Sequence, residues 1–177
     1  PLPIKPDAVF PNNWISTHSD GTIILYPIFA PNRRMERRAD IVAHLKDNYV
    51  VTRNIDWSHH EKQGIFLEGT GSIVFDHNHK TAFACSSPRT NKELFYQLCD
   101  LLQYTPVYFK AIDNRQNEIY HCNVVMNIGE HFAIVCLDCI PSLQEKTQVI
   151  EILIQNNLDI IPISIEQMMQ FAGNMLS

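Results

Sequence analysis

The chain has 177 residues, of which 45% are hydrophobic and 19% are charged, so it is large and apolar enough to form a folded domain with a core. Its 14 basic and 19 acidic side chains give a net charge of −5, which argues against a general nucleic-acid-binding protein. No apolar run approaches the roughly 20 residues that a membrane-spanning helix needs, so we expect no membrane association.

The first predicted unit covers about residues 1–57 and has the order strand, strand, helix, strand. Turn residues at Ser19-Asp20-Gly21 precede the second strand, and Val42 and Leu45 share one face of the helix. The predicted elements are an opening strand that begins at Phe10, a strand over 21–27, a helix over 35–47 and a strand over 49–55.

The same order recurs in about residues 58–113 and again in about residues 114–163. The aromatic residues Phe10, Phe66, Tyr120 and Phe171 stand at corresponding positions, with spacings of 56, 54 and 51 residues. After opening strands at Phe66 and Tyr120, the sequence predicts strands over 80–86, 105–112, 131–137 and 158–163, and helices over 91–103 and 143–156.

Residues 164–177 predict the start of a fourth unit. Ser164 and Gln167 form a possible capping box for a short helix over 164–170, and an opening strand follows from Phe171. A repeat array normally ends on a capping element and not within a repeat. We therefore expect residues 1–177 to be a single partial domain, taken from a longer chain.

The five cysteines, Cys85, Cys99, Cys122, Cys136 and Cys139, are odd in number, and three of them lie in apolar, strand-like runs. This pattern favours buried, reduced thiols and a cytoplasmic protein. Cys136 and Cys139 form a C-x-x-C pair, but no second pair stands at the spacing of a zinc site. We therefore predict no metal site.

Polar residues are unexpectedly frequent in the unit openings, where Asn13, Glu68, His121 and Asn123 stand among apolar neighbours. If the units surround an axis, these residues converge, and convergent polar groups indicate a binding or catalytic site. Glu68 could instead cap the turn at residues 69–71, and His121 could be an ordinary core or surface histidine. A phosphate-binding loop is excluded, because residue 71 leads into a strand and no Lys-Ser/Thr pair follows.

Two arginine segments also require interpretation. The run NRRMERR (32–38) is either a solvated helix start or a binding site for an anion or carboxylate, and Arg33 is our candidate for the residue that binds it. Arg89, in the loop SSPRTN (86–91), precedes a predicted helix and could bind a carboxylate in a bidentate manner or lie at the surface.

Several motifs resemble the arginine deiminase/amidinotransferase (pentein) superfamily, and most of all its bacterial amidinotransferase-like, citrulline-utilising hydrolases. The motifs are PDAVFPNNW (6–14), YPIFAPNRRMERR (26–38), FLEGTGS (66–72), SSPRTN (86–91), YHCNVVMNIGEHFAIVCLD (120–138) and FAGNML (171–176). The resemblance implies an α+β fold, a pentein-type α/β propeller of ββαβ repeats with a central active site. Three repeats and the start of a fourth would be present.

The resemblance also assigns roles to particular residues. Glu68 would hold the nitrogens of a guanidino or ureido group, and His121 would transfer protons. Asp7 and Asn13 would orient the planar head of the substrate, and Arg89 would bind its α-carboxylate.

The sequence departs from the family at Asn13 and Asn123, where arginine deiminases have aspartates. Carboxylates suit a cationic guanidinium, whereas neutral amides can donate to the carbonyl oxygen of a ureido group. The departures therefore favour a citrulline-like or acylated small-molecule substrate.

The family uses a cysteine nucleophile near its C-terminus, and none of the five cysteines stands there. Cys122 adjoins His121, but neighbours on the predicted strand would point to opposite faces. We expect a C–N hydrolase that acts through a covalent cysteine intermediate, needs no cofactor, and takes its nucleophile from outside this chain. A non-catalytic pentein-fold binding module and an amidinotransferase are the alternatives, and a homo-oligomer is possible.

Overall fold

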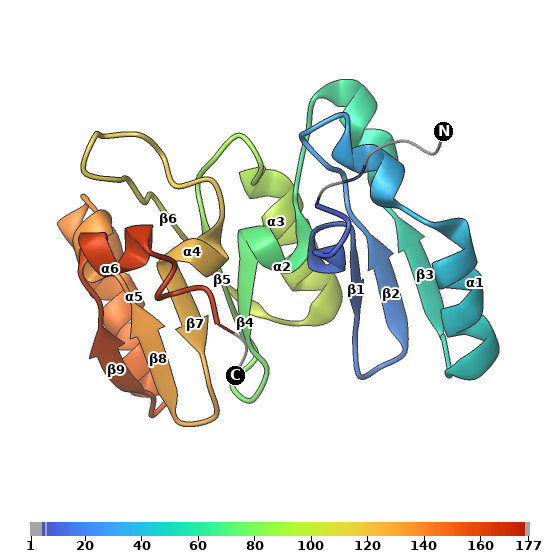
Figure 1. Cartoon of the computed structure of the whole chain (residues 1–177). Coiled ribbons are helices and arrows are strands. Elements are labelled where there is room, and N and C mark those ends of the chain that lie inside the picture. Colours follow the sequence, from blue (N-terminus) through green and yellow to red (C-terminus); the bar gives the residue numbers. More distant parts are fainter. Residues whose placement is uncertain (1–4, 6, 176–177) are drawn as a thin grey trace. The chain divides into compact units, whose positions relative to one another are not determined.

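The structure is a computed structural model that describes residues 5 and 7–175 (Figure 1). The chain divides into two compact units, Pro1–Thr70 and Gly71–Ser177. Helices and strands occur in both units, so the predicted α+β class is confirmed. In the part of the chain that is described, no helix combines the length and the hydropathy needed to cross a bilayer.

The first unit contains one three-stranded sheet. Strand β1 pairs with β2 in antiparallel orientation, and β2 pairs with β3 in parallel orientation. Trp14, Ile28 and Val42 pack together as buried apolar residues of this unit. Its elements are η1 (Pro11–Asn13), β1 (Ile15–Thr17), β2 (Thr22–Leu25), η2 (Arg33–Glu36), α1 (Ala39–Asn48), β3 (Arg53–Asp56) and η3 (Ser58–Gln63).

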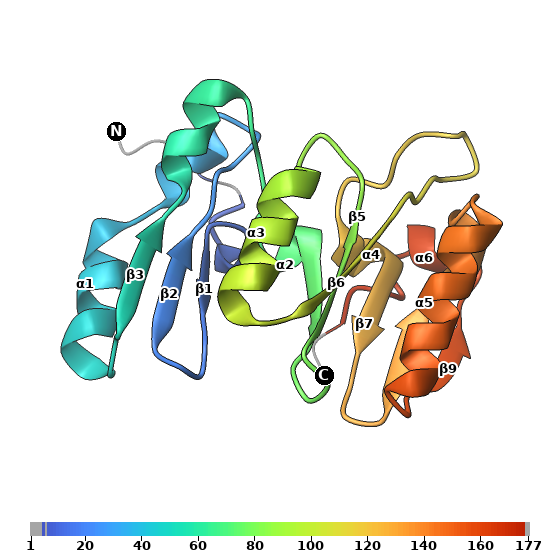
Figure 2. The same cartoon turned by 180° about the vertical axis from the view of Figure 1, so that it is seen from behind.

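The second unit contains two sheets of the same strand order and orientation as the first unit's sheet. Figure 2 shows helices α3 and α5 lying in front of the strands of these sheets. The elements are α2 (Gly69–Ser72), which crosses the boundary between the units, then β4 (Ile73–Asp76), β5 (Thr81–Cys85), α3 (Lys92–Leu102), β6 (Thr105–Phe109), α4 (Cys122–Val125), β7 (Met126–Ile128), β8 (Phe132–Val135), η4 (Leu137–Cys139), α5 (Leu143–Gln155), β9 (Asp159–Pro162) and α6 (Ile165–Met169).

One apolar core joins the two sheets of the second unit. Phe83 and Phe109 from the first of these sheets and Val135 from the other lie in it, all almost completely buried. A half-buried polar contact also links the sheets, because Asn156 donates to the carboxylate of Asp76 at 2.9 Å. The helices begin at side-chain caps, since Asn91 accepts from Leu94 N–H and Ser142 accepts from Glu145 N–H.

The capping box of Ser164 and Gln167 is confirmed at the start of α6. Next to it, Gly173 approaches the backbone of α4 so closely that a Cβ atom there would lie 2.6 Å from the carbonyl oxygen of Val124. Residues 171–173 form a turn where the sequence predicted an opening strand, and residues 176 and 177 lie outside the described residues.

The openings of the three predicted strand–strand–helix–strand repeats were expected to be strands, and this prediction is wrong. They are short helical turns, η1, α2 and α4, and the strands β1, β4 and β7 begin only after them. Gly69 has φ of +41°, which a strand cannot adopt, and Pro11 favours the first turn of a helix. The predicted helix over 35–47 also begins later, at residue 39, because residues 33–36 form the separate turn η2.

The strands β2, β5, β6, β8 and β9 and the helices α3 and α5 lie within the ranges that the periodicity predicted, whereas α1 and β3 begin at residues 39 and 53, each later than predicted. The strands are a few residues shorter than the apolar runs that indicated them. The further prediction, that the three sequence repeats are ββαβ blades of a propeller around an axis, stays a prediction.

Candidate active site

Glu68 is the residue of the first unit that the sequence singled out most strongly, and its side chain is completely buried. Its Oε1 accepts a hydrogen bond from the backbone N–H of Phe29 at 3.0 Å. A buried carboxylate requires such donors, because removal from water disfavours its charged form. Glu68 is therefore held in a defined orientation by a backbone group 39 residues away in the sequence.

Gly69 allows the backbone directly after Glu68 to lie against the backbone of Asn12. A Cβ atom at this position would lie 2.2 Å from the carbonyl oxygen of Asn12, and the residue has a positive φ. Only glycine fits both conditions. The turn after Glu68 is thus packed directly against the opening turn η1, which carries Asn13.

Arg33 lies beside Asp7 and Glu68 in the same unit. Its Nη2 is 2.9 Å from Oε2 of Glu36, and it also donates to the carbonyl oxygens of Asp7 and Phe10, at 3.3 Å in each case. Burial by itself lowers the pKa of Arg33, but the hydrogen bond to Glu36 and the negative charges of Glu36, Glu68 and Asp7 outweigh it. The pKa of Arg33 therefore lies above its ordinary value.

The other two candidates of the first unit lie near these residues. The carboxylate of Asp7 is half-buried and approaches Nε of Arg33 at 3.9 Å. Asn13 is buried and ends η1. The structure thus places the carboxylates of Asp7, Glu36 and Glu68 near the guanidinium of Arg33.

In the second unit, His121 is 6% exposed and stands at the N-cap position of α4. Its ring lies 4.9 Å from the ring of Tyr120, measured between centroids. The guanidinium carbon of Arg89 lies 5.3 Å from the centroid of the same tyrosine ring, in a cation–π contact. Tyr120 therefore connects His121 with Arg89.

The loop that carries Arg89 is held by hydroxyl groups. Oγ of Ser72 donates to the carbonyl oxygen of Arg89 at 2.9 Å, and Oγ of Ser87 accepts from the N–H of Arg89 at 3.1 Å. Ser87 also donates to the carbonyl oxygen of Tyr120 at 2.9 Å. The backbones of residues 89 and 120 are thus tied together through one side chain.

Asn123 follows His121 by two residues and lies in α4. Its Oδ1 atom is buried and has no hydrogen-bond partner among the described residues. Buried polar atoms of proteins almost always have a partner, so an exception requires an explanation. A donor N–H from a bound molecule would supply one.

The cysteines are all buried and free. Because His121 and Cys122 lie at the start of a helix, the argument that they point to opposite faces of a strand is wrong. Cys122 is nevertheless unsuited to act as a nucleophile, since burial, together with the neighbouring thiol of Cys85, raises its pKa well above the ordinary value. Among the described residues, no group of three or more His, Cys, Asp or Glu side chains could hold a metal ion.

The candidates thus form two groups, Asp7, Asn13, Arg33 and Glu68 in the first unit and Arg89, His121 and Asn123 in the second. That all of them line one active site stays a prediction. Sequence reasoning missed Glu36 and Tyr120 as partners of Arg33 and Arg89. The spacing of three residues between Arg33 and Glu36 could have indicated that ion pair.

Comparisons with known proteins agree on the kind of fold. The profile of the family described as N,N dimethylarginine dimethylhydrolase, eukaryotic, matches residues 3–177. A search of the curated proteins finds no match.

The solved structures that are similar to this chain include the following three. The apo structure of ArgZ, a cyanobacterial arginine dihydrolase of the ornithine-ammonia cycle, is 18% identical with a TM-score of 0.74, over 100% of this chain and 26% of that one. The N-terminal domain of ArgZ, in an asparagine-to-serine variant covalently bonded to a reaction intermediate, is 18% identical with a TM-score of 0.72, over 97% and 58%. A histidine-to-glycine variant of dimethylarginine dimethylaminohydrolase, as an adduct with S-methyl-L-thiocitrulline, is 16% identical with a TM-score of 0.63, over 96% and 57%. This chain therefore spans less than two thirds of each of these relatives.

Proposed function

Because the chain belongs to the N,N-dimethylarginine dimethylhydrolase family, and with it to the pentein superfamily, we propose that it supplies part of the active site of a C–N hydrolase. The substrate of this enzyme is a small molecule with a guanidino or ureido group, of the arginine or citrulline type. The observation that carries the proposal is the completely buried carboxylate of Glu68, held by Phe29 N–H next to Asp7 and Arg33.

Glu68 is assigned to the binding of the substrate's planar head. A carboxylate accepts N–H bonds from a guanidino or ureido group in two parallel contacts, and such charge-assisted bonds are about twice as strong as neutral ones. Asp7 and Asn13 are proposed to orient the same head. Arg33 enters as the cation that balances Asp7 and Glu68, with its N–H groups bonded to Glu36 and to backbone carbonyls.

His121 is assigned to proton transfer and Arg89 to the α-carboxylate of the substrate. A buried imidazole at a helix start can protonate the leaving nitrogen and then accept a proton from water. The guanidinium carbon of Arg89 lies over the ring of Tyr120. A guanidinium can contact an aromatic ring and also bind a carboxylate in a bidentate manner through its in-plane N–H groups.

We base the choice between guanidino and ureido substrates on the hydrogen-bonding groups of Asn123. An amide offers both an acceptor and a donor, as does the O=C–NH₂ end of a ureido group, whereas an aspartate at this position would offer acceptors alone. Because Oδ1 of Asn123 has no partner within the described part of the chain, it supports a contact to a substrate N–H. We therefore favour a citrulline-like or acylated substrate over free arginine.

The proposed reaction proceeds through a covalent intermediate, as in the ArgZ structure that contains one. A thiolate attacks the central carbon of the substrate's head group, the C–N bond breaks, and His121 gives its proton to the departing amine. Water then attacks the carbon, gives a proton to His121 and releases the thiolate. Cys122 is a buried thiol with a raised pKa, and none of the five cysteines stands at the position of the family's nucleophile, so the proposal takes the thiolate from outside these 177 residues.

The test is an assay of the complete gene product with arginine, its N-methylated forms, citrulline and their N-acyl derivatives. We expect release of ammonia or amine from at least one of them, and a large decrease of this release, to a still measurable rate, in Glu68→Gln. An added amine that ends up in the product would show an amidinotransferase. Absence of turnover for all of them, in a folded protein that contains the missing cysteine, would favour the binding-module alternative.

A further inference from the structure

Residues Tyr26–Phe29 connect β2 to the arginine run and provide the N–H group that binds Glu68. The hydrogen bonds of this segment are fully accounted for, although it belongs to no helix or strand. Tyr26 N–H donates to Trp14 O, and Pro27 O accepts from Leu67 N–H, at 2.9 and 3.1 Å. Every remaining backbone N–H and C=O group of the segment is bonded to a charged side chain.

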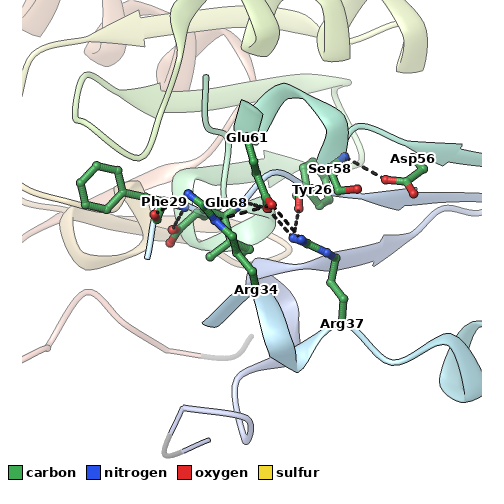
Figure 3. Close-up of polar contacts among 9 residues, drawn as sticks. Tyr26, Phe29, Arg34, Arg37, Asp56, Ser58, Glu61 and Glu68 are labelled. Atoms are coloured by element: carbon green, nitrogen blue, oxygen red, sulfur yellow. Dashed lines mark hydrogen bonds and ion pairs between the residues drawn. The ribbon is translucent and has the colours of Figure 1, made fainter. Parts of the chain in front are cut away.

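Those charged side chains belong to Arg34, Glu61, Arg37 and Glu68 (Figure 3). Arg37 Nη1 donates to Tyr26 O at 3.2 Å and Ile28 N–H donates to Glu61 Oε1 at 2.7 Å. Arg34 donates through Nε to Ile28 O at 2.8 Å and through Nη2 to Phe29 O at 3.0 Å. An irregular segment depends on such partners, because a buried backbone group without one costs about 1–3 kcal/mol.

The three residues Arg34, Glu61 and Arg37, here called the clamp, are also bonded to one another. Arg37 binds both oxygens of Glu61, at 2.5 and 2.9 Å, and Arg34 Nε lies 3.5 Å from Oε2. The side chain of Glu61 is only 10% exposed. Glu61 is carried by η3, whose first residue Ser58 donates its N–H to Asp56 at the end of β3, at 2.8 Å.

The clamp reaches Glu68 from two sides. On one side, it bonds the carbonyl of Phe29 and the N–H of Ile28, the groups next to the amide that donates to Glu68. On the other side, the guanidinium carbon of Arg34 lies 5.5 Å from the ring centroid of Phe66, two residues before Glu68. The rings of Phe29 and Phe66 are 5.2 Å apart, so both segments are packed together under one guanidinium.

We propose that Arg34, Glu61 and Arg37 are positioning residues, which set the direction of the Glu68 carboxylate through the segment Tyr26–Phe29. The effect of these three residues on catalysis rests on the function proposed above. The clamp touches no reacting atom in this scheme. It acts through the Phe29 N–H, and a reacting group displaced by about 1 Å loses up to about 100-fold in rate.

The first experiment measures hydrogen exchange of the Phe29 amide by NMR in the complete gene product. Arg37→Gln should accelerate this exchange at least about tenfold, since the segment loses the bidentate partner of Glu61. The matched control is Arg38→Gln, from the same run, because Arg38 pairs only with the exposed Asp40 among the described residues. We expect no acceleration in the control and none at Ile24 in β2 of either variant.

The second experiment tests whether the clamp acts through Glu68. Arg37→Gln should lower kcat/KM by about 10- to 100-fold in the natural background and cause no further loss in a Glu68→Gln background. Arg37→Lys retains the charge without the planar fork and should give an intermediate value. This variant also keeps the test open if Arg37→Gln does not fold.

The outcomes separate the two proposals. The positioning role of the clamp is overturned if the exchange of the Phe29 amide is unchanged in folded Arg37 variants. It is also overturned if Arg37→Gln causes equal losses of kcat/KM in both Glu68 backgrounds. If the natural protein turns over no substrate, the proposed function fails, and the clamp is then judged by the ¹³C shift of the Glu68 carboxylate. A shift that moves in Arg37→Gln but not in Arg38→Gln supports the clamp, and one that stays in place in both overturns it.

Discussion

The two units hold their candidate residues by different means. In the first, Glu68 lies near ion pairs that are largely removed from water, Arg33 with Glu36 and the clamp around Glu61. In the second unit, His121 is the N-cap residue of α4. The first residue of this helix, Cys122, is packed in an apolar core that contains four of the five cysteines. We therefore expect the stability of the first unit to respond mainly to changes of charge, and that of the second unit to changes of volume and polarity in its core.

Loss of proton transfer in the second unit should reduce activity more than any other change described below. His121→Asn should lower kcat/KM by about 100- to 10,000-fold, because an amide cannot transfer the proton to the leaving nitrogen. Circular dichroism and thermal melting should stay close to those of the natural protein. A collapsed spectrum would assign His121 a structural role, and the comparison between the units would then lose its catalytic side.

The second effect separates the units by charge. Glu36→Gln leaves Arg33 without its buried partner and should destabilise the first unit by about 3–5 kcal/mol in denaturant unfolding. Asp40→Asn breaks an ion pair of the same type that is exposed to water, and it should leave the unfolding midpoint unchanged. Equal effects of the two variants would show that the buried pairs do not hold this unit.

The third effect tests the apolar nature of the second unit. Cys122→Ser places a hydroxyl group in the core and should cost about 1–3 kcal/mol of unfolding free energy, whereas Cys122→Ala should cost less. Both variants should retain turnover, since Cys122 is not the nucleophile of the proposed reaction. Abolished turnover in a folded Cys122→Ala protein would reopen that assignment.

The smallest effect concerns acid. Hydrogen bonds from Thr22, together with Arg53, lower the pKa of Asp20 from 3.8 to about 2. A carboxyl group with a lowered folded-state pKa stabilises the protein above the unfolded value, and this contribution is lost as the pH falls from about 4 to about 2. Asp20→Asn should therefore flatten the stability profile of the first unit in this window. A natural-protein profile that is already flat there would contradict the shift.

Much of the fold could be predicted because its signals are local. The helix α3 follows from the spacing of Leu94, Phe95 and Leu98, and α6 follows from the capping box at Ser164. The openings misled the prediction, because Val124 and Val125 favour strands locally, whereas in the structure they lie in α4, where Gly173 packs closely against Val124.

The candidate site was predictable only in its parts. The polar residues of the openings indicated Glu68 and His121, and both side chains are buried. Nothing near the arginine run pointed to Glu61, which is 24 residues from Arg37 in the sequence. Partners at such distances depend on the path of the chain, which local spacing does not encode.

The close approach of Gly69 to Asn12 has a consequence for the time at which the site forms. The contact joins the two ends of the first unit, and the bonds from Ile28 to Glu61 and from Phe29 to Glu68 span 33 and 39 residues. Closing long loops costs more chain entropy than pairing the neighbouring strands β1 and β2. We expect the Glu68 carboxylate to be oriented late in folding, so that the Phe29 amide gains protection after the β1–β2 amides in a pulse-labelling experiment. Simultaneous protection would mean that the sheet and the site form as one step.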